Sequence, residues 1–393
     1  MNILFLLGRY PNYGGTEIVT TLLGNKFHQK GNTVHIVSFD QPFPDLVSEL
    51  EEGIELHELR FPVRKKSNVK LLRQIVQKYK INVIINQWCF PFYVTQLCRK
   101  ATKGLHCKLI AVHHGSPDTS GRIENVRIKI KENKRTLKGL LLNLKLIFLK
   151  KITFESLRYV YHHSDRYILL SDRFSDIFKR KTHIKNDSKL LAIPNPITLN
   201  DRKFTYSTVK KKKEIIYVGR LISTLKRVDR LIDIWEIIGH QYPDWTFTII
   251  GDGPEREKLI KESHERDLER IRFEGYQNPL KYYRRASILI LTSEREGLPL
   301  VVIEGMNFGV VPIVNGSFPA VFDLIEDGIS GFITPLPYQS IDMVSKIKML
   351  MDNPILLDTM AKKAIIQSNC FDITNILNQW HLVLNSLLED CGN

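Results

Sequence analysis

The sequence predicts an α/β protein of two doubly wound domains that face each other across a cleft. Three observations lead to this prediction. The chain has 393 residues, which is more than a single hydrophobic core usually organises. Short apolar runs alternate with longer helical patterns, as expected for βαβ units and parallel sheets. This alternation stops at a polar, lysine-rich stretch near the middle of the chain and then begins again.

Short apolar runs in both halves are the predicted strands. Each run is bounded by turn residues and is too short for a buried helix. Because crossover helices cover both faces of a parallel sheet, the runs should be fully buried. They lie at 2–7, 33–39, 82–87, 108–113, 166–171 and 189–194 in the first half, and at 214–219, 246–251, 270–275, 287–292 and 310–314 in the second.

A change of composition marks the predicted domain boundary near 197–212. The stretch IPNPITLNDRKFTYSTVKKKKE contains two prolines, polar residues and four consecutive lysines, which suits a linker. We therefore predict a first Rossmann-like domain over 1–200 and a second over 201–375. A final leucine-rich helix, 376–393, could pack back on the first domain.

The composition restricts the class of protein. Five cysteines without a CxxC pair argue against a disulfide framework or a zinc site, and fit a reducing compartment. The first apolar run, Ile3 to Leu7, has no cationic region before it and is too short for a signal peptide. No run reaches the roughly 18 apolar residues that suggest a membrane span. We therefore expect a soluble, cytoplasmic protein.

The excess of positive charge points to an anionic partner. The formal net charge is +15, which favours a polyanion, an anionic membrane surface or a phosphorylated substrate. Residues 122–151 hold ten Lys or Arg against two Glu, a net charge of +8. Leu137, Leu141, Leu144 and Phe148 would share one helical face there. Two interpretations stay open: a core helix with a solvated basic flank, or a helix lying on an anionic bilayer.

Doubly wound sheets bind ligands beyond the carboxyl ends of their strands, so the residues after each predicted strand are the candidate site. In the first half, Gly14 and Gly15 precede a helical pattern, and adjacent glycines let backbone N–H groups approach an anion. The loop lacks the GxGxxG pattern of dinucleotide binding and does not support NAD. His114 follows the strand 108–113, within HHGSP.

The second half places two cations and two acids after its strands. Arg220 and Lys226 follow the strand 214–219, and together they are suited to a phosphate group. Glu296 precedes a helix that should begin at Pro299, and Glu304 lies inside that helix. A carboxylate accepts two hydrogen bonds and can hold paired sugar hydroxyls, so these acids are candidate ligands of a nucleotide sugar.

With these residues assembled, the chain resembles the retaining glycosyltransferases of family 4, which have the GT-B fold. The resemblance covers essentially the whole chain and is strongest in the second half. EGLPLVVIE, residues 296–304, is similar to the family's E-x7-E motif, and GRLISTLKRVDRLI is similar to its donor-phosphate motif. IIGDGPE, RFEGY and IPNPI occur in the family order, while GGTE and HHGSP are less specific matches.

The resemblance implies a role for each site residue. Arg220 and Lys226 would neutralise the donor diphosphate, and Gly14 and Gly15 would approach it from the first domain. His114 would contact the transferred sugar near its reacting carbon. His113 is the alternative match, but the glycine and proline spacing favours His114. Glu304 would hold the ribose hydroxyls, and Glu296 would contact the donor sugar. The sugar or phosphate would meet the backbone of Gly297, Leu298, Pro299 and Leu300. Tyr276, beside Gly275, would border the base.

The resemblance also implies the reaction. A hexose or N-acetylhexosamine would move with retention from a nucleotide sugar, UDP-linked in preference to GDP-linked, to a glycan or lipid-linked acceptor in cell-surface polysaccharide or lipopolysaccharide synthesis. No cofactor and no essential metal are expected, because Arg220, Lys226 and helix N-termini could offset the diphosphate charge. The protein could attach peripherally to the cytoplasmic membrane face through residues 122–151.

Four other functions remain as alternatives to a transferase. A nucleotide-sugar epimerase or a phosphorylase can use the same architecture, and product analysis separates either from transfer. A basic nucleic-acid binder is disfavoured because the sequence shows no recognition motif and no aromatic-interleaved basic patch. A catalytically silent scaffold is disfavoured by the joint presence of Glu296 and Arg220.

Overall fold

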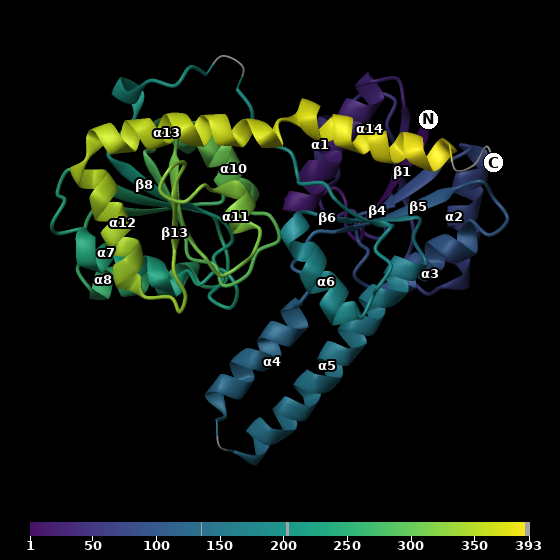
Figure 1. The fold of residues 1–393 in the computed structure, drawn as a ribbon, viewed down its shortest axis with the longest axis horizontal. Helices are drawn as coiled ribbons and strands as arrows, with labels where there is room; N and C mark the ends of the chain where they lie inside the picture. The colour runs from purple at the N-terminus through teal and green to yellow at the C-terminus, as the bar shows by residue number, and fades with distance from the viewer. Residues whose placement is uncertain (135, 202–203, 390–393) are drawn as a thin grey trace. The chain divides into compact units, whose positions relative to one another are not determined.

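The computed structural model describes residues 1–134, 136–201 and 204–389. They form two compact units. Unit 1 comprises Met1–Thr198 and the chain from Ile373 onward, and unit 2 comprises Leu199–Asp372. Each unit is a parallel sheet flanked by helices (Figure 1), so the predicted class of two doubly wound domains is confirmed.

Unit 1 contains a parallel sheet in the order β3-β2-β1-β4-β5-β6-β7. The apolar runs of the sequence form its inner strands because both faces of this sheet are covered. The strands are β1 (Asn2–Leu6), β2 (Thr33–Ser38), β3 (Glu55–Glu58), β4 (Val83–Asn86), β5 (Lys108–His113), β6 (Arg166–Leu169) and β7 (Leu190–Ala192), and the helices are α1 (Gly15–Gln29), α2 (Lys66–Lys78), α3 (Phe92–Ala101), α4 (Gly121–Glu132), α5 (Leu137–His162), α6 (Ser175–Thr182) and α14 (Ile373–Glu389).

Unit 2 contains a second parallel sheet, in the order β10-β9-β8-β11-β12-β13. Its first strand, β8, lies between β9 and β11, as β1 lies between β2 and β4 in unit 1. The strands are β8 (Glu214–Val218), β9 (Thr246–Ile250), β10 (Ile271–Gly275), β11 (Ile288–Leu291), β12 (Val311–Asn315) and β13 (Phe332–Thr334), and the helices are α7 (Asp229–Ile238), α8 (Arg256–Glu265), α9 (Leu280–Arg285), α10 (Leu300–Asn307), α11 (Val321–Leu324), α12 (Ser340–Asp352) and α13 (Pro354–Ser368).

Two strands escaped the sequence analysis, and both lie at a sheet edge. β3 has the sequence ELHE, in which two acids flank Leu56 and His57. β13 has only three residues. An edge strand has a neighbour on one side only and needs no continuous apolar run, which is why neither segment carries the signal that identified the inner strands.

The last helix of the chain belongs to unit 1 and not to unit 2. Trp380 on α14 is buried, and its ring meets that of Phe27 on α1 edge-to-face, with centroids 6.5 Å apart. His381 adds a second ring contact to Phe27 at 5.8 Å. The chain therefore passes between the units twice, once near residue 198 and again near residue 372.

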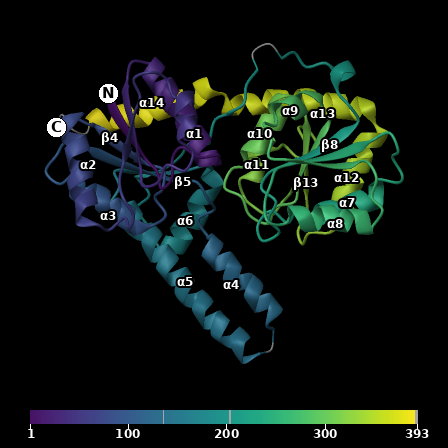
Figure 2. The same ribbon diagram turned by 180° about the vertical axis from the view of Figure 1, so that it is seen from behind.

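Helices α4 and α5 form a hairpin that projects from the rest of unit 1 in both views (Figures 1 and 2). The second half of α5 packs on the unit through buried residues such as Leu157 and Val160. In the first half, Leu137, Leu144 and Phe148 are 59 to 75% exposed. The interpretation of this segment as a core helix is therefore wrong, because the face that carries these residues is not covered.

Among the described residues, no helix combines the length and the hydropathy that crossing a bilayer requires.

Candidate functional site

The topology brings together side chains that are far apart in the sequence. In unit 2, β8 pairs with β11, so the loops that leave their carboxyl ends are neighbours. One loop carries Arg220 and Lys226, and the other carries Glu296. The strand order reverses between β8 and β11, and in open α/β sheets this position is where ligands bind.

Lys226 and Glu296 form an ion pair at this position. The Lys226 Nζ lies 2.7 Å from the Glu296 Oε1, and the Ser293 hydroxyl donates to the same oxygen at 2.6 Å. The Glu296 side chain is largely buried. Among the described residues, the Glu296 Oε2 has no hydrogen-bond partner, and the Lys226 ammonium has none besides Glu296. The pair therefore keeps both a carboxylate oxygen and two ammonium N–H groups for a ligand.

Arg220 is exposed at the mouth of the β8 loop, and its guanidinium has no partner among the described residues. Backbone contacts with the next loop hold its position: the Leu221 N–H donates to the Asp252 carbonyl at 2.9 Å. A Cβ at Gly251 would lie 1.9 Å from the Gly219 carbonyl oxygen, so the two loops touch backbone to backbone. A fixed main chain with an exposed guanidinium is suited to grip an arriving anion.

Glu304 lies on α10, which begins at Leu300 after Pro299 as its N-cap. Its carboxyl group is buried, and the Tyr283 hydroxyl donates to its Oε2 at 3.1 Å. The loop residue Leu298 is buried as well, which anchors the start of the helix. The apolar run between the two glutamates therefore fixes Glu304 on the helix while Glu296 stays in the loop before it.

A charged network that the sequence did not reveal holds the Lys226 loop. Arg227 has a φ of 50° and donates to Asp229 and, at 3.1 Å, to Glu294. Arg230 pairs with Glu294 as well and donates to the Thr292 carbonyl at 2.8 Å. These residues join the start of α7 to the end of β11, and burial lowers the pKa of Arg230. They read in the sequence as ordinary surface charges, so only the strand pairing could have identified them.

Two other residues of the predicted donor site are Tyr276, which lies further from Arg220, and Gly297, which can contribute only its backbone. Tyr276 follows β10 and is 59% exposed, and Gly275 before it has a φ of 68°. β10 is separated from β8 by β9, so Tyr276 stands two strands from Arg220. Gly297 belongs to the loop between β11 and α10.

In unit 1 the glycine loop begins α1, with Gly14 as its N-cap and Gly15 as its first residue. A Cβ at Gly14 would lie 2.1 Å from the Glu17 Oε2, so the carboxylate of this helix already covers the loop. Burial raises the pKa of Glu17. The start of α1 therefore holds an acid of the protein itself in the region where an anion was predicted.

The two histidines that end β5 have different surroundings. His113 is buried, with its Nδ1 3.0 Å from the Tyr167 hydroxyl. His114 lies in the loop, with its Nε2 2.5 Å from the Gln87 Oε1 at the end of β4. Burial lowers the pKa of both rings, to about 4 for His113 and about 3 for His114. The sequence pattern places Gln87 only at the end of a strand and does not reveal this contact with His114.

The hydrogen bond to Gln87 fixes which nitrogen of His114 carries a proton. Because the Gln87 Oε1 is an acceptor, the His114 Nε2 must donate. The Nδ1 of the neutral ring is then an acceptor, and it is buried without a partner among the described residues. His114 can therefore receive a hydrogen bond from a ligand hydroxyl, whereas His113 is already engaged in the core.

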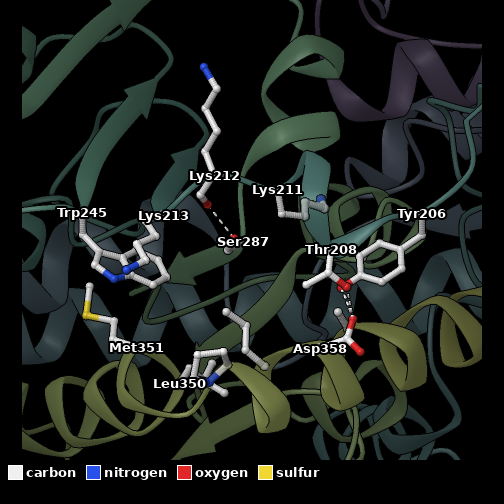
Figure 3. A pocket seen from close by; sticks show the side chains of 14 residues that line it. Tyr206, Thr208, Lys211, Lys212, Lys213, Trp245, Ser287, Leu350, Met351 and Asp358 are labelled. Carbon is white, nitrogen blue, oxygen red and sulfur yellow. Dashed lines mark hydrogen bonds between the residues drawn. The ribbon is translucent and has the colours of Figure 1, made fainter.

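Figure 3 shows a pocket in unit 2. It lies at the amino ends of the strands, whereas the candidate site lies at their carboxyl ends. Lys213, Trp245 and Ser287 line it, and each precedes a strand. Asp358 on α13 accepts hydrogen bonds from Tyr206, at 3.0 Å, and from the Thr208 hydroxyl. Ligands of doubly wound sheets bind at the carboxyl edge. This pocket is therefore where the linker is fastened to α13, not part of the candidate site.

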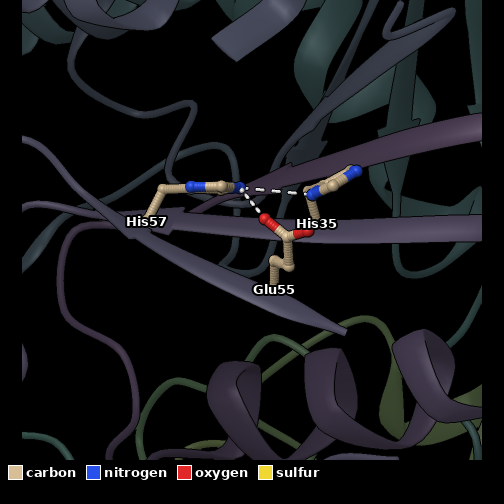
Figure 4. A group of neighbouring side chains, drawn as sticks. All are labelled: His35, Glu55 and His57. Carbon is tan, nitrogen blue, oxygen red and sulfur yellow. Dashed lines mark hydrogen bonds and ion pairs between the residues drawn. The ribbon is translucent and has the colours of Figure 1, made fainter. Parts of the chain in front are cut away.

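His35, Glu55 and His57 form a compact group on β2 and β3 (Figure 4), with potential ligand atoms within 4.8 Å of one another. Burial lowers the pKa of both rings, and the His35 Nδ1 lies 3.2 Å from the His57 Nε2. The His35 Nε2 is buried without a partner among the described residues, whereas a metal-bound imidazole normally donates its other N–H. The Tyr79 ring lies tilted against His35, with centroids 4.2 Å apart, so the group packs at the sheet edge.

Two family models together match nearly the whole chain. Residues 13–201 match the model of Glycosyltransferase Family 4. Residues 200–367 match the model of Glycosyl transferases group 1. The first match contains Gly14, Gly15 and His114, and the second contains Arg220, Lys226, Glu296 and Glu304.

Individual relatives agree with these matches. An uncharacterized glycosyltransferase of Haemophilus influenzae is 27% identical over 97% of this chain and 99% of its own length. An α-1,4-N-acetyl-D-galactosaminyltransferase of Campylobacter jejuni, named for an undecaprenol-diphosphate glycan, is 26% identical over 47% of this chain and 52% of its own. The crystal structure of Anabaena HepE with UDP and glucose matches 98% of this chain and 100% of that one, with a TM-score of 0.74 and 18% identity.

Proposed function

The chain belongs to the family 4 glycosyltransferases of the GT-B fold, and we propose that it moves a hexose or N-acetylhexosamine from a UDP-sugar to a glycan or lipid-linked glycan. The observation that carries this proposal is the Lys226–Glu296 ion pair at the ends of β8 and β11. It places a cation for phosphate and a carboxylate for sugar hydroxyls side by side. The UDP in the structure of Anabaena HepE supports the choice of nucleotide.

The cations of unit 2 hold the diphosphate of the donor. Lys226 keeps Glu296 as one partner and offers its remaining N–H groups to phosphate oxygens. Arg220 adds a guanidinium that can bind two oxygens at once. Negative charge grows on the diphosphate as the bond to the sugar breaks, so cations fixed in advance stabilise the departing nucleotide. This arrangement needs no essential metal ion, and the reaction is proposed to run without one.

The two carboxylates hold hydroxyl groups of the donor. The Oε2 of Glu296 accepts from the transferred sugar, because Lys226 and Ser293 both bind the other oxygen. Glu304 accepts from the ribose, held in place by its helix and by Tyr283. The loop from Gly297 to Leu300 contacts the sugar or phosphate, and Tyr276 borders the base.

Unit 1 binds the acceptor in this proposal and also adds contacts to the donor. His114 accepts a hydrogen bond from the transferred sugar through its Nδ1. Gly14 and Gly15 approach the diphosphate, which requires the Glu17 carboxylate to move away from Gly14. In transfer with retention, the bond from the anomeric carbon to phosphate breaks as the bond to the acceptor oxygen forms on the same face. The acceptor proton then passes to the leaving phosphate. A neutral His114 orients the sugar and does not supply a proton.

Charge and the names of the relatives support the proposed acceptor class. The Campylobacter jejuni relative is named for an undecaprenol-diphosphate glycan, and a relative in Erwinia amylovora is named for amylovoran biosynthesis. We therefore place this enzyme in cell-surface polysaccharide synthesis, in the cytoplasm and at the membrane face, where the basic segment 122–151 meets anionic lipid. Nucleic acid is not a partner in this proposal.

Thermal stabilisation by nucleotides tests the donor site. Purified protein is heated with UDP, GDP, ADP, CMP or NAD, with EDTA present throughout. A ligand at about 100 times its dissociation constant adds roughly 2.7 kcal/mol if it binds only the folded state. We expect a shift with UDP that disappears in Arg220→Ala and Glu304→Ala. A shift with NAD alone, or with none of these nucleotides, would overturn the proposal.

Product analysis then separates transfer from epimerisation. With a UDP-sugar and an acceptor, a transferase releases UDP and forms a new glycosidic bond. An epimerase returns a changed sugar. If EDTA abolishes the reaction while UDP still binds, the metal-independent step is wrong although the donor assignment stands.

A further inference from the structure

The first half of α5 exposes an apolar stripe, which Lys151 interrupts near its end. With 3.6 residues per turn, its members fall within a sector about 140° wide. Each of these side chains is 48 to 75% exposed. Below, "the α5 stripe" means Leu137, Leu140, Leu141, Leu144, Ile147, Phe148 and Ile152.

The opposite side of the same helix is already occupied. Gly139 is buried against the end of α4, where a Cβ would lie 2.2 Å from the Asn133 carbonyl oxygen. Further along, Thr153 and Leu157 pack on the body of unit 1. α5 thus carries apolar residues on two sides, with lysines between them, and the apolar sides of a helix are normally covered. One side has its partner within the chain, and the α5 stripe has none among the described residues.

The charges around the stripe identify its partner. From Asn133 to Phe154 the sequence contains no Asp or Glu, while Lys138, Lys145, Lys150 and Lys151 lie on α5 itself. If a second copy packed its stripe against this one, the lysines of the two copies would come close, and their positive charges would repel. An anionic bilayer suits both features, because leucines enter the acyl boundary while lysine stems extend to the phosphates.

We propose that the α5 stripe inserts into the interface of an anionic lipid bilayer and carries the protein's membrane attachment. The attachment differs from adsorption of the whole basic segment, because apolar side chains of α5 supply it and the lysines select anionic lipid. α4 contributes charge, and its Ile123 and Val126 are buried. The proposal deepens the membrane contact of the proposed function, but its test needs neither donor nor acceptor.

Vesicle flotation tests the insertion. The full chain is mixed with vesicles of phosphatidylglycerol and phosphatidylcholine in equal parts, or of phosphatidylcholine alone, and bound protein is measured after centrifugation. Wild type should float with the anionic vesicles. Leu144→Glu/Phe148→Glu should bind them at least about tenfold more weakly, because two inserted side chains are lost. Lys138→Ala and Lys145→Ala should each weaken binding about fivefold.

A matched control adds the same charge elsewhere. Ile355 and Leu382 are 81% and 73% exposed on α13 and α14, so Ile355→Glu/Leu382→Glu should float like wild type. The midpoint of urea denaturation should be equal in all variants, which shows that they are folded. The proposal is overturned if wild type fails to float at low salt, or if Leu144→Glu/Phe148→Glu floats like wild type. It is also overturned if light scattering shows a stable dimer that only Leu144→Glu/Phe148→Glu dissociates.

Discussion

Lys226 and Glu296 lie 70 residues apart in the sequence and meet at 2.7 Å between the ends of two paired strands. Neither residue is unusual alone, since the chain holds 57 Lys or Arg and 42 Asp or Glu. The pairing of β8 with β11 makes them neighbours. The Ser293 hydroxyl also donates a hydrogen bond to the Glu296 carboxylate and helps to fix it. The ion pair is therefore built into the fold before any ligand arrives.

Replacing Lys226 should weaken nucleotide binding. In Lys226→Met, the ammonium that faces the diphosphate is lost while most of the stem is kept. A charge-assisted hydrogen bond contributes about 1.5–3 kcal/mol, so titration calorimetry should show UDP binding about 10-fold to 100-fold more weakly. Lys258, an exposed lysine on α8, gives the control: Lys258→Met should bind UDP like wild type. Equal affinities in both variants would remove Lys226 from the phosphate site.

Replacing Glu296 should separate binding from turnover. Glu296→Gln keeps the size of the side chain but loses the charge that meets the sugar. We expect UDP affinity to change less than about threefold, because UDP has no transferred sugar, while kcat/KM falls about 100-fold. Steady-state kinetics with a UDP-sugar provide the measurement. A loss of UDP affinity as large as the loss of kcat/KM would place Glu296 on the phosphate instead.

Gly251 should tolerate no side chain. Its φ is 144°, and a Cβ would lie 1.9 Å from the Gly219 carbonyl oxygen. Gly251→Ala should therefore lower the free energy of unfolding by more than about 2 kcal/mol and weaken UDP binding by moving Arg220. Gly104 has a φ of 74° and nothing within 4 Å of a Cβ, so Gly104→Ala carries the backbone strain alone. Urea denaturation of both variants measures the difference, and equal losses would contradict the clash.

Acid should destabilise the fold through His113. Burial lowers its pKa to about 4, whereas an unfolded histidine has a pKa near 6.5. Between these values the unfolded chain binds a proton that the folded chain does not. The free energy of unfolding therefore decreases as the pH is lowered. For this residue the decrease is about 2 kcal/mol between pH 7 and pH 5. Urea denaturation at the two pH values should show a smaller drop in His113→Gln than in wild type. His163→Gln, at an exposed histidine, is the control and should lose as much free energy of unfolding between the two pH values as wild type. If His113→Gln loses as much as well, His113 is not the origin of the pH dependence.

Gln87 should act on the reaction through His114. In Gln87→Ala the His114 Nε2 loses its acceptor, so the ring is free to turn or to change tautomer. We expect kcat to fall about tenfold with UDP affinity unchanged, and Gln87→Glu, which keeps an acceptor, to recover part of the activity. Kinetics of both variants beside His114→Ala test this role. If Gln87→Ala matches wild type, the hydrogen bond does not orient the ring.

The inner strands could be predicted because their burial leaves a continuous apolar run, as in Ile288–Leu291. The edge strand β3 could not, since its two acids face solvent and Leu56 is its one apolar residue. The site residues were found where a strand ends in Gly, Arg or His, and the doubly wound topology predicts that these ends matter. The same logic could not reveal Gln87 or Arg230, because their role depends on which strands are neighbours, and strand order is not written in any local pattern.

The double passage of the chain between the units has a practical consequence for making parts of this protein. A single cut in the linker after Thr198 leaves both units covalently joined through Asp372 and Ile373. Ending an expression clone at residue 198 would also strip α14 from α1 and leave Phe27 without its Trp380 partner. An isolated unit 2 is therefore encoded by residues 199–372, whereas an isolated unit 1 requires a spliced gene in which codon 198 is followed, after a short spacer, by codon 373.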